Sequence, residues 1–329
     1  MFSYNKRLKM ITNNGAQVPK MIEFTKLEPM GFENSCITIG NFDGLHRGHQ
    51  AIIECMVRNA KLQKKPVIVV TFFPNPADFF NSKTNAFYLC SPEEKSARLR
   101  QMGVDSVITF QFDRDFANLS PRQFLSKLKN SLGLGVLVVG RDFALGKDRK
   151  GTLPVIKALG RELDFTVEMI QPVNLGTEVI SSTRIRQSLD EGDVELAAKL
   201  LGRHYSIPGV VTHGSDRGSR IGLPTANIKH WPHKKLPAVG VYASYVHVLG
   251  QTHKGMTNVG YRPTFEDQKQ PSIETHILDF DENIYGERMA VKFVKKIRDE
   301  QKFSGVEAFL AQIERDKTTA RRIFSDDEI

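Results

Sequence analysis

Features that mark disulfide-rich, zinc-binding and membrane-spanning proteins are scarce in this sequence. Only three cysteines occur in 329 residues, Cys36, Cys55 and Cys90, and their spacing is not paired. This argues against a disulfide framework and a zinc site, and it favours a reducing compartment. The longest apolar run, residues 67–73, is interrupted by a threonine and is far shorter than the roughly 20 residues of a membrane span. Residues 1–22 lack the apolar segment of a secretory signal, so we expect a cytoplasmic protein without a membrane partner.

Positive charge exceeds negative charge but is not concentrated anywhere along the chain. Lysine and arginine number 46 against 37 aspartates and glutamates, a formal net charge of +9. Such a surplus attracts nucleic acids and also small polyanionic substrates. The sequence has no arginine-rich tract, zinc-finger spacing or basic-zipper pattern, so we expect no nucleic-acid partner. By itself the charge is best interpreted as a soluble surface rich in lysine.

The first half of the chain alternates between strand-like and helix-like segments. Ser-Pro pairs at residues 91–92 and 120–121 have the N-cap and N1 chemistry that begins a helix. Strands that alternate with helices predict a parallel sheet covered by helices. Residues 1–34 are interpreted as an extended or poorly structured lead-in. The strands are predicted at residues 36–39, 67–73, 107–110, 136–139 and 166–170, with further helices at residues 47–62 and 153–163.

Glycine and proline become frequent after residue 186, and the apolar runs become shorter. A helix over residues 194–201 is predicted to end at Gly202, a common C-cap residue. Short strands separated by turns indicate an antiparallel sandwich or barrel, and apolar residues at helical spacing predict a terminal amphipathic helix. We therefore expect a lead-in at 1–34, an α/β domain at 35–186 and a β-rich domain at 187–329. The strands of the last domain are predicted at residues 205–211, 241–248, 256–259, 273–280 and 289–293.

Two histidines stand in the segment between the first predicted strand and the first helix. Residues 40–49 read Gly-Asn-Phe-Asp-Gly-Leu-His-Arg-Gly-His, so His46 and His49 share one face of the first helical turn. Free backbone N–H groups there favour an anion, and Gly48 lets a ligand approach the backbone closely. Two imidazoles at this place can stabilise a phosphate whose charge rises in a transition state. The alternative is an ordinary helix with two surface histidines.

A cluster of hydroxyl side chains with arginine precedes the second half of the chain. Residues 181–183 are Ser-Ser-Thr, and Arg184 and Arg186 follow. Hydroxyls at a helix start can cap its free amides or donate to phosphate oxygens, and an arginine can grip a phosphate with two N–H groups. The alternative is a plain N-cap followed by solvent-exposed arginines.

These two segments resemble the phosphate-binding motifs of nucleotidylyltransferases, in the version found in bacterial bifunctional riboflavin kinase/FAD synthetases. The family arginine corresponds to Arg186. Residues 139–151 resemble the family's Gly-x-Asp-Phe-x-Phe-Gly loop, which implies that Asp142 holds the flavin nucleotide or orients the histidines, and Leu145 stands where the family usually has Phe. Asn75 stands where the family often has the histidine of Pro-His-Pro, and an amide can form hydrogen bonds but carries no charge.

A glycine-dense segment, residues 213–227, opens the β-rich domain. Spaced glycines among basic residues can form a loop whose amides face phosphates, although the segment is not a Walker A sequence. Thr225 and Asn227 offer hard oxygen ligands that suit Mg²⁺. Without context, a flexible turn region is an equally good interpretation. The segment resembles the Gly-Phe-Pro-Thr-Ala-Asn motif of riboflavin kinases, with Leu223 in place of Phe.

An acidic residue, Glu274, stands directly after Ile273 in the strand predicted at residues 273–280. A surface-facing glutamate is the plain interpretation of such a pattern. The riboflavin kinases that the chain resembles have their catalytic base at this position, which favours a functional role. Residues 240–242 and 257–265 resemble further motifs of that domain.

The resemblance spans roughly residues 36–317 and implies a Rossmann-like nucleotidylyltransferase domain, then an antiparallel β-barrel riboflavin kinase domain with a C-terminal helix. It implies an enzyme that phosphorylates riboflavin to FMN with ATP and Mg²⁺ and adenylylates FMN to FAD, with riboflavin, FMN and ATP as its ligands. The residues implied are catalytic His46, His49 and Glu274; ATP- or phosphate-binding Gly40, Asn41, Phe42, Asp43, Gly48, Ser181, Ser182, Thr183, Arg186, Gly214, Gly218 and Gly222; flavin-binding Asn75, Asp142 and Arg262; and magnesium-binding Thr225 and Asn227.

Two alternatives remain at this point. A monofunctional nucleotidylyltransferase for pantetheine phosphate or glycerol phosphate would account for the two histidines but not for the β-rich domain. A nucleic-acid-binding protein would account for the positive charge but requires clustered basic and stacking residues, which the sequence lacks.

Overall fold

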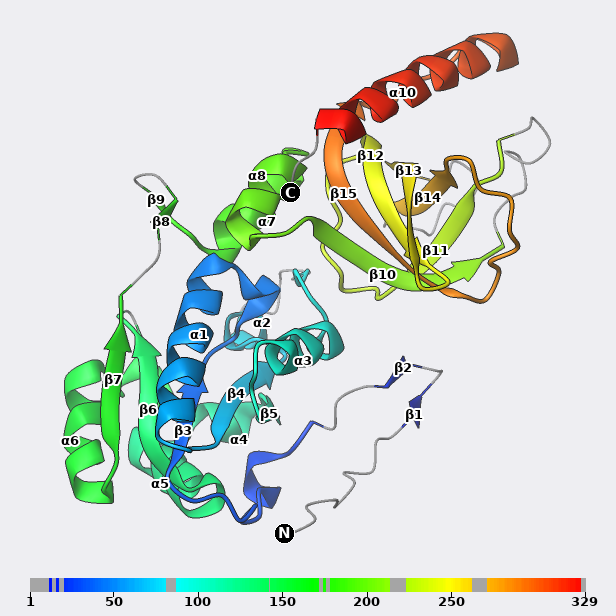
Figure 1. Ribbon diagram of the computed structural model, residues 1–329. Helices are drawn as coiled ribbons and strands as arrows, with labels where there is room; N and C mark the ends of the chain where they lie inside the picture. The colour runs from blue at the N-terminus through cyan, green and yellow to red at the C-terminus, as the bar shows by residue number, and fades with distance from the viewer. Residues whose placement is uncertain are drawn as a thin grey trace. The chain divides into compact units, whose positions relative to one another are not determined.

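The computed structural model describes residues 12–13, 16–17, 21–80, 87–141, 143–171, 174–175, 178–213, 223–261 and 271–326 (Figure 1). The chain forms two compact units. The first consists of Met1–Ala86 and Cys90–Ile180, and the second consists of Phe87–Leu89 and Ser181–Ile329.

A parallel sheet of five strands forms the centre of the first unit, as the sequence predicts. The strand order is β5-β4-β3-β6-β7, so β3, the first of these five strands along the chain, lies in the middle and the order reverses between β3 and β6. In open α/β sheets, ligands bind beyond the carboxyl ends of the strands at such a reversal. The strands are β3 (Ser35–Ile39), β4 (Val67–Phe73), β5 (Ser106–Gln111), β6 (Leu134–Gly140) and β7 (Thr166–Ile170).

Helices cover this sheet, and two of them begin as their Ser-Pro pairs predict. Ser91 and Ser120 are N-caps in capping boxes, each with proline in the first turn. The short helices α2 and α4 are not predicted from the sequence because five and four residues carry too little periodicity. The helices of this unit are α1 (Arg47–Leu62), α2 (Pro76–Phe80), α3 (Pro92–Gln101), α4 (Arg114–Ala117), α5 (Pro121–Leu132) and α6 (Leu153–Leu163), with 3₁₀ turns at Phe24–Lys26, Asp43–Leu45 and Lys147–Arg149.

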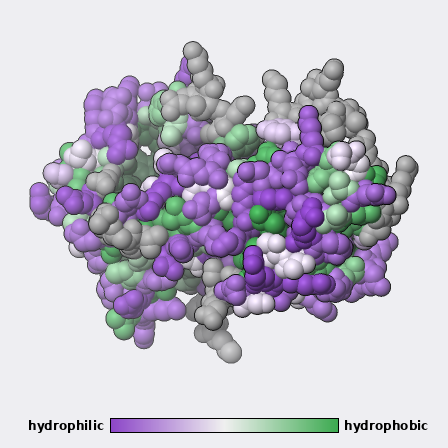
Figure 2. Space-filling view, turned by 90° about the horizontal axis from the view of Figure 1, so that it is seen from above, coloured by the Kyte–Doolittle hydropathy of each residue, from purple (hydrophilic) through white to green (hydrophobic). Residues whose placement is uncertain are grey.

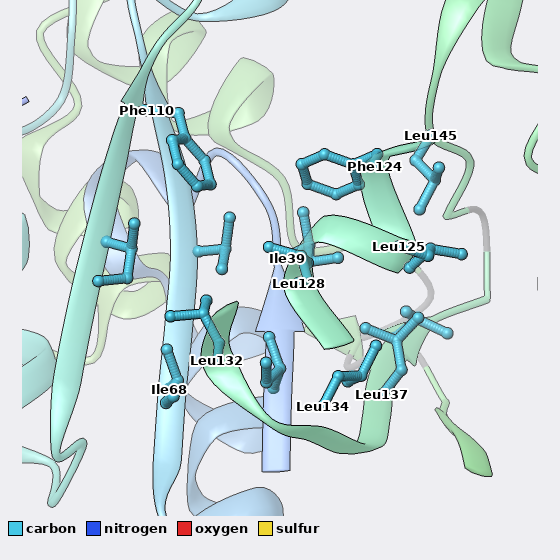
Figure 3. Packing of buried hydrophobic residues seen from close by; sticks show 14 of the residues in the cluster. Ile39, Ile68, Phe110, Phe124, Leu125, Leu128, Leu132, Leu134, Leu137 and Leu145 are labelled. Carbon is cyan, nitrogen blue, oxygen red and sulfur yellow. The ribbon is translucent and has the colours of Figure 1, made fainter. Parts of the chain in front are cut away.

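Apolar side chains fill the space between the sheet and its helices. On one side, Ile68, Phe110 and Leu137 of the sheet pack with Phe124 and Leu128 of α5 (Figure 3). The segment before β3 contributes to the same core, although the sequence suggests an extended or poorly structured lead-in. There, Leu27 is buried and the ring of Phe24 lies 5.3 Å from that of Phe110. A second cluster, with Val69 and Val138 of the sheet and Ile53 and Met56 of α1, packs on the other face. Dense packing on both faces holds the ends of the strands in fixed positions.

The second unit is built around a closed antiparallel barrel in the order β10-β11-β14-β13-β12-β15. The sequence predicts five of its six strands. It does not predict β11, because Ala-Asn-Ile-Lys-His lacks a clear strand pattern and follows a glycine-dense segment. The strands are β10 (Tyr205–Thr212), β11 (Ala226–His230), β12 (Gly240–Val248), β13 (Gln251–Gly260), β14 (Ser272–Ile277) and β15 (Arg288–Arg298); two-residue strands occur at Thr12–Asn13, Ala16–Gln17, Asn174–Leu175 and Glu178–Val179.

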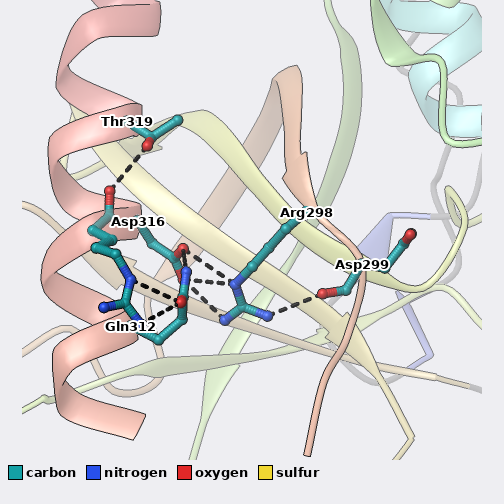
Figure 4. A network of polar contacts seen from close by, with 6 residues as sticks. Arg298, Asp299, Gln312, Asp316 and Thr319 are labelled. Carbon is teal, nitrogen blue, oxygen red and sulfur yellow. Dashed lines mark hydrogen bonds and ion pairs between the residues drawn. The ribbon is translucent and has the colours of Figure 1, made fainter. Parts of the chain in front are cut away.

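In the described part of the second unit, the helices α7 (Ser182–Asp190), α8 (Val194–Leu201) and α10 (Val306–Asp326) accompany the barrel. As predicted, α8 ends at Gly202, which has a left-handed backbone. An ion pair joins α10 to the end of β15, where Arg298 Nε donates to both carboxylate oxygens of Asp316, at 3.1 and 2.9 Å (Figure 4). The amide of Gln312 donates to the same carboxylate at 2.8 Å. Because Asp316 is almost fully buried, this network fixes the helix against the barrel.

The short segment Phe87–Leu89 belongs to the second unit although it precedes α3 in the chain. The backbone N–H of Tyr88 donates to the carbonyl of His233 at 2.8 Å, and the N–H of Lys235 donates to the carbonyl of Tyr88 at 2.8 Å. Lys234 is buried and its Nζ donates to the carbonyl of Leu89 at 2.8 Å. The second unit is therefore not contiguous in sequence.

Hydrophilic residues cover most of the face shown in Figure 2, with smaller hydrophobic areas between them. Among the described residues, no helix has the length and apolar character needed to cross a membrane.

Candidate active sites

A tight turn joins β3 to α1 at the carboxyl edge of the sheet. Phe42 and Leu45 adopt positive φ angles of 47° and 44°, which side chains with a Cβ rarely accept. Gly44, with φ 77°, lies between them and needs no Cβ. Such backbone strain is typical of functional sites, where the surrounding structure holds an unfavourable conformation. The turn places His46 at the N-cap of α1.

The two histidines lie face to face at the start of α1. Their ring centroids are 3.6 Å apart and the rings are inclined by 18°. The backbone N–H of His49 donates to Nδ1 of His46 at 3.3 Å, so Nδ1 is an acceptor and the neutral ring of His46 carries its proton on Nε2. The geometry thus presents an Nε2–H donor at a helix N-terminus, where an anion is favoured.

Gly48 makes this stacked arrangement possible. A Cβ at this position would lie 3.1 Å from Cε1 and Nδ1 of His46, closer than a side chain normally approaches. The carbonyl oxygen of Ile180 would lie 3.8 Å from the same Cβ.

Burial keeps His49 uncharged. Removal from water, and then electrostatic interaction with His46 and Lys95, hold the pKa of His49 well below its usual value of 6.5. Among the described residues its Nδ1 is buried without a hydrogen-bond partner, a state that typically costs about 1–3 kcal/mol. A group kept at such a cost is more readily explained by function than by stability.

The lowered pKa of His49 predicts a loss of stability in acid. Below pH 6.5 the unfolded chain binds a proton at His49 that the folded chain does not bind, so the free energy of unfolding falls as the pH falls. Between pH 7.5 and 5.5 the parent protein should lose about 1.4 kcal/mol more than a His49→Asn variant, the value of one pH unit for one proton. Urea unfolding at the two pH values measures this difference. An equal loss in the two proteins would contradict it.

Three further predicted residues of the first site, Gly40, Asp43 and Asn75, lie along the same edge of the sheet. The carboxylate of Asp43 is buried and accepts a hydrogen bond from the backbone N–H of Cys90 at 3.2 Å, so it helps to shape the turn. A Cβ on Gly40 would meet the ring of Phe42 at 3.1 Å, which explains the glycine. Asn75 is also buried and lies just beyond the carboxyl end of β4.

The hydroxyl cluster forms the start of α7, which belongs to the second unit. Ser181 is the N-cap and its Oγ accepts a hydrogen bond from the backbone N–H of Arg184 at 3.2 Å. Ser182 and Thr183 begin the helix, and Nε of Arg186 donates to the carbonyl of Phe87 at 3.1 Å. The sequence analysis predicts that these residues belong to the domain at 35–186. In the structure, the helix that carries them packs against α8 in the second unit.

Three described candidate residues of the kinase site, Thr225, Asn227 and Glu274, come together on the barrel. Asn227 of β11 lies directly opposite Glu274 of β14, and Glu274 lies directly opposite Asn258 of β13. Residues opposite one another in neighbouring strands point to the same side of the sheet. The adjacent Thr275 points to the other side and is fully buried. A carboxamide, a carboxylate and a second carboxamide therefore form a row across three strands, with Thr225 immediately before β11.

Two residues of these sites are given no role by the sequence analysis. One is Asn258, which lies in the motif at residues 257–265 and which only the strand register places beside Glu274. The other is Lys95 of α3, which is 5% exposed. Helical spacing could have indicated its burial, because Lys95 and the fully buried Leu99 are four residues apart and share a helix face. Five predicted site residues lie outside the described residues: Asp142, Gly214, Gly218, Gly222 and Arg262.

Comparison with known protein families matches each unit to an enzyme domain. Residues 29–184 match the family model for FAD synthetase, and residues 201–324 match the one for riboflavin kinase. These two matches define a two-domain enzyme class of flavin nucleotide synthesis, with the FAD synthetase domain first.

Known proteins with the same two domains are similar along most of the chain. The bifunctional riboflavin kinase/FMN adenylyltransferase of Bacillus subtilis is 38% identical over 89% of this chain and 93% of its own, and that of Escherichia coli is 39% identical over the same shares. The chain belongs to the bifunctional riboflavin kinase/FMN adenylyltransferase family. A crystal structure described as a macrolide-efflux protein from Streptococcus pneumoniae aligns with a TM-score of 0.83 and 31% identity, over 91% of this chain and 97% of that one.

Proposed function

We propose that the second unit phosphorylates riboflavin to FMN and that the first unit transfers AMP from ATP to FMN to give FAD. The observation that carries this proposal is the agreement between the two family matches and the two groups of polar residues, one at the β3–α1 turn and one on the barrel. A monofunctional nucleotidylyltransferase would leave the riboflavin kinase match unexplained.

In the kinase step, Glu274 is proposed as the general base. The 5′-hydroxyl of riboflavin is a poor nucleophile until its proton is removed, and a carboxylate within reach can accept that proton. Asn227 and Asn258 stand on the two neighbouring strands opposite Glu274 and would restrict its movement and hydrogen bonding. The γ-phosphate of ATP is transferred to the oxygen of the hydroxyl group, and ADP leaves.

Magnesium fits the oxygen donors of this site. Mg²⁺ prefers oxygen ligands, keeps several waters and commonly takes few ligands from the protein when substrate phosphates supply the others. Thr225 and Asn227 would hold the ion, which supplies charge neutralisation to the ATP phosphates. Among the described residues, no cluster of three histidine, cysteine, aspartate or glutamate side chains offers a separate metal site. This agrees with an ion bound mainly through ATP.

In the adenylyl-transfer step, the phosphate of FMN attacks the α-phosphorus of ATP and pyrophosphate leaves. The attacking oxygen is already an anion, so no protein base is required, and catalysis depends on position and charge stabilisation. His46 would donate its Nε2–H, and the first turn of α1 would add backbone N–H groups. The hydroxyls of Ser181, Ser182 and Thr183 and the guanidinium of Arg186 are proposed to bind phosphate groups.

We also propose a cytoplasmic location. Cys36, Cys55 and Cys90 are all free thiols, as a reducing compartment requires. Burial raises the pKa of the Cys36 thiol to about 12, so it is not a reactive nucleophile at neutral pH.

The position of α7 predicts where the kinase unit can be cut from the chain. A fragment that begins at Ser181 keeps the N-cap of α7 and the fully buried Ile185, whereas one that begins at Gln187 loses them. A lost cap costs about 0.5–2 kcal/mol and a lost buried aliphatic side chain about 2–5 kcal/mol. The Ser181 fragment should make FMN but no FAD, and the Gln187 fragment should unfold at a lower temperature. Equal stability of the two fragments would contradict the place of α7 in this unit.

Labelled ATP tests the proposed pair of reactions. The chain is incubated with riboflavin, Mg²⁺ and ATP labelled either at the γ- or at the α-phosphorus, and the flavins are separated by chromatography. The γ label should enter FMN and then FAD, whereas the α label should enter FAD alone. The α label in FMN, or no label in any flavin, would refute the proposal.

A further inference from the structure

Lys95 is a buried lysine at the edge of the sheet where the two histidines lie. The first turn of α3 holds it there, because the Ser91–Glu94 capping box and Pro92 fix the helix start directly before it. Its side chain reaches the carboxyl ends of β3 and β4, and the residue is 5% exposed. A lysine is almost never buried to this degree unless its charge is paired or has a function.

The amino group of Lys95 is bonded only to neutral oxygens among the described residues. Nζ donates to the backbone carbonyl of Asn41 at 2.7 Å and to Oγ1 of Thr71 at 3.0 Å. The hydroxyl of Thr71 donates in turn to the same carbonyl at 3.2 Å. An ammonium has three N–H groups, and these contacts use two of them. The charge is therefore held firmly without being paired to a carboxylate.

The surroundings of Lys95 and of the two histidines favour a charged lysine and uncharged imidazoles. Burial lowers the pKa of Lys95, while the charges of Cys90 and Asp43 act in the opposite direction and favour the ammonium form. The charge of Lys95 is one of the causes that lower the pKa of His49. His46 uses Nδ1 as an acceptor for the N–H of His49 and so is held in a neutral form. The positive charge in this region thus lies on the lysine and not on the imidazoles.

We propose that the buried ammonium of Lys95 supplies the fixed positive charge of the adenylyl-transfer site, and that His46 and His49 act there as neutral hydrogen-bonding groups. A fixed charge in a site of low dielectric constant stabilises the charge that develops on a phosphate more strongly than the same charge in water. Lys95 can have this role only if the first unit transfers AMP to FMN, as proposed above. Its contact with Asn41 also holds the turn that carries the histidines, so the test must separate charge from structure.

Three variants of the full chain make that separation. Lys95→Met removes the charge and the N–H donors, and Lys95→Gln removes the charge but keeps an N–H donor for the carbonyl of Asn41. Lys157→Met removes the same charge from an exposed position on α6 and is the matched control. The measurements are kcat and KM for FMN adenylylation, riboflavin phosphorylation in the same preparation, and the unfolding temperature.

Both Lys95 variants should lose about 10²–10³-fold in kcat for FMN adenylylation, the usual effect of removing one stabilising group from a transition state. KM for ATP should change less than kcat, and riboflavin phosphorylation and Lys157→Met should be close to the parent. The unfolding temperature of Lys95→Met should be unchanged or higher, because an apolar side chain replaces a buried charge at low cost.

Two results would overturn the role of Lys95. Lys95→Gln with adenylylation close to the parent would show that the N–H donor suffices without the charge. A loss of kcat in both Lys95 variants that is accompanied by a marked fall in their unfolding temperature would assign Lys95 a structural role. If Lys95→Met did not fold, Lys95→Gln would decide alone. A parent protein that makes no FAD would refute the proposed function itself, a result distinct from any effect of Lys95.

Discussion

Replacement of either histidine at the start of α1 should reduce FAD formation by two or more orders of magnitude. The loss follows from the removal of a hydrogen-bond donor at the place where the phosphate charge rises. His46→Ala also removes the N-cap of α1, which typically costs about 0.5–2 kcal/mol of stability. His46→Asn avoids that complication, because asparagine is a good N-cap residue without an imidazole. The rate of FAD formation from supplied FMN and ATP measures the effect.

Riboflavin phosphorylation serves as the internal control for the histidine variants. It should be nearly unchanged in His46→Asn and His49→Ala, since the kinase residues belong to the barrel unit. If FMN formation and FAD formation fell together in a folded variant, the assignment of separate sites would be wrong. If His46→Asn formed FAD at the rate of the parent protein, the role of His46 would be limited to capping α1.

Glu274→Gln should reduce FMN formation by about 10²–10⁴-fold, the usual contribution of general acid–base catalysis. The substitution keeps the size and hydrogen bonding of the side chain but removes its basicity at neutral pH. Glu274 lies between Asn227 and Asn258 in the strand register, so the amide can remain in place without a large rearrangement. Riboflavin phosphorylation at saturating ATP and Mg²⁺ is the measurement.

The matched control for Glu274→Gln is Glu282→Gln, the same change at an exposed position of the same unit. This control should phosphorylate riboflavin at the parental rate, and FMN adenylylation should continue in both variants. If Glu274→Gln phosphorylated riboflavin at the rate of the parent protein, Glu274 would not be the base and would be an ordinary surface residue of β14.

Local chemistry explains which elements the sequence predicts well. The amphipathic run of α1, the β-branched run of β4 and the capping boxes of α3 and α5 are determined by neighbouring residues, so their bounds or starts agree with the structure. The parallel sheet and the barrel follow from the order of such elements. The resemblance to riboflavin kinase/FAD synthetases supplied the candidate residues, and the structure places His46 beside His49 and Asn227 beside Glu274.

Features that depend on distant parts of the chain are missing from the sequence-based interpretation. The strand β11 has mixed polarity and owes its pairing to β10 and β14 on either side. The burial of Lys95 depends on which face of α3 packs against the sheet. The position of its amino group depends on a hydrogen bond to the carbonyl of Asn41, 54 positions away in the chain. Likewise, α7 joins the second unit through packing with α8 that a local pattern does not reveal.

A mixing experiment tests most directly the central claim that one chain carries two separable chemical steps. His46→Asn and Glu274→Gln are each supplied with riboflavin, ATP and Mg²⁺, alone and in an equimolar mixture, and FAD is measured over time. Each variant alone should form FAD slowly, and the mixture should form it at least about ten times faster than the sum of the two, because one variant releases the FMN that the other adenylylates. A mixture no faster than that sum, from variants that each perform their remaining step on supplied substrate, would contradict the account.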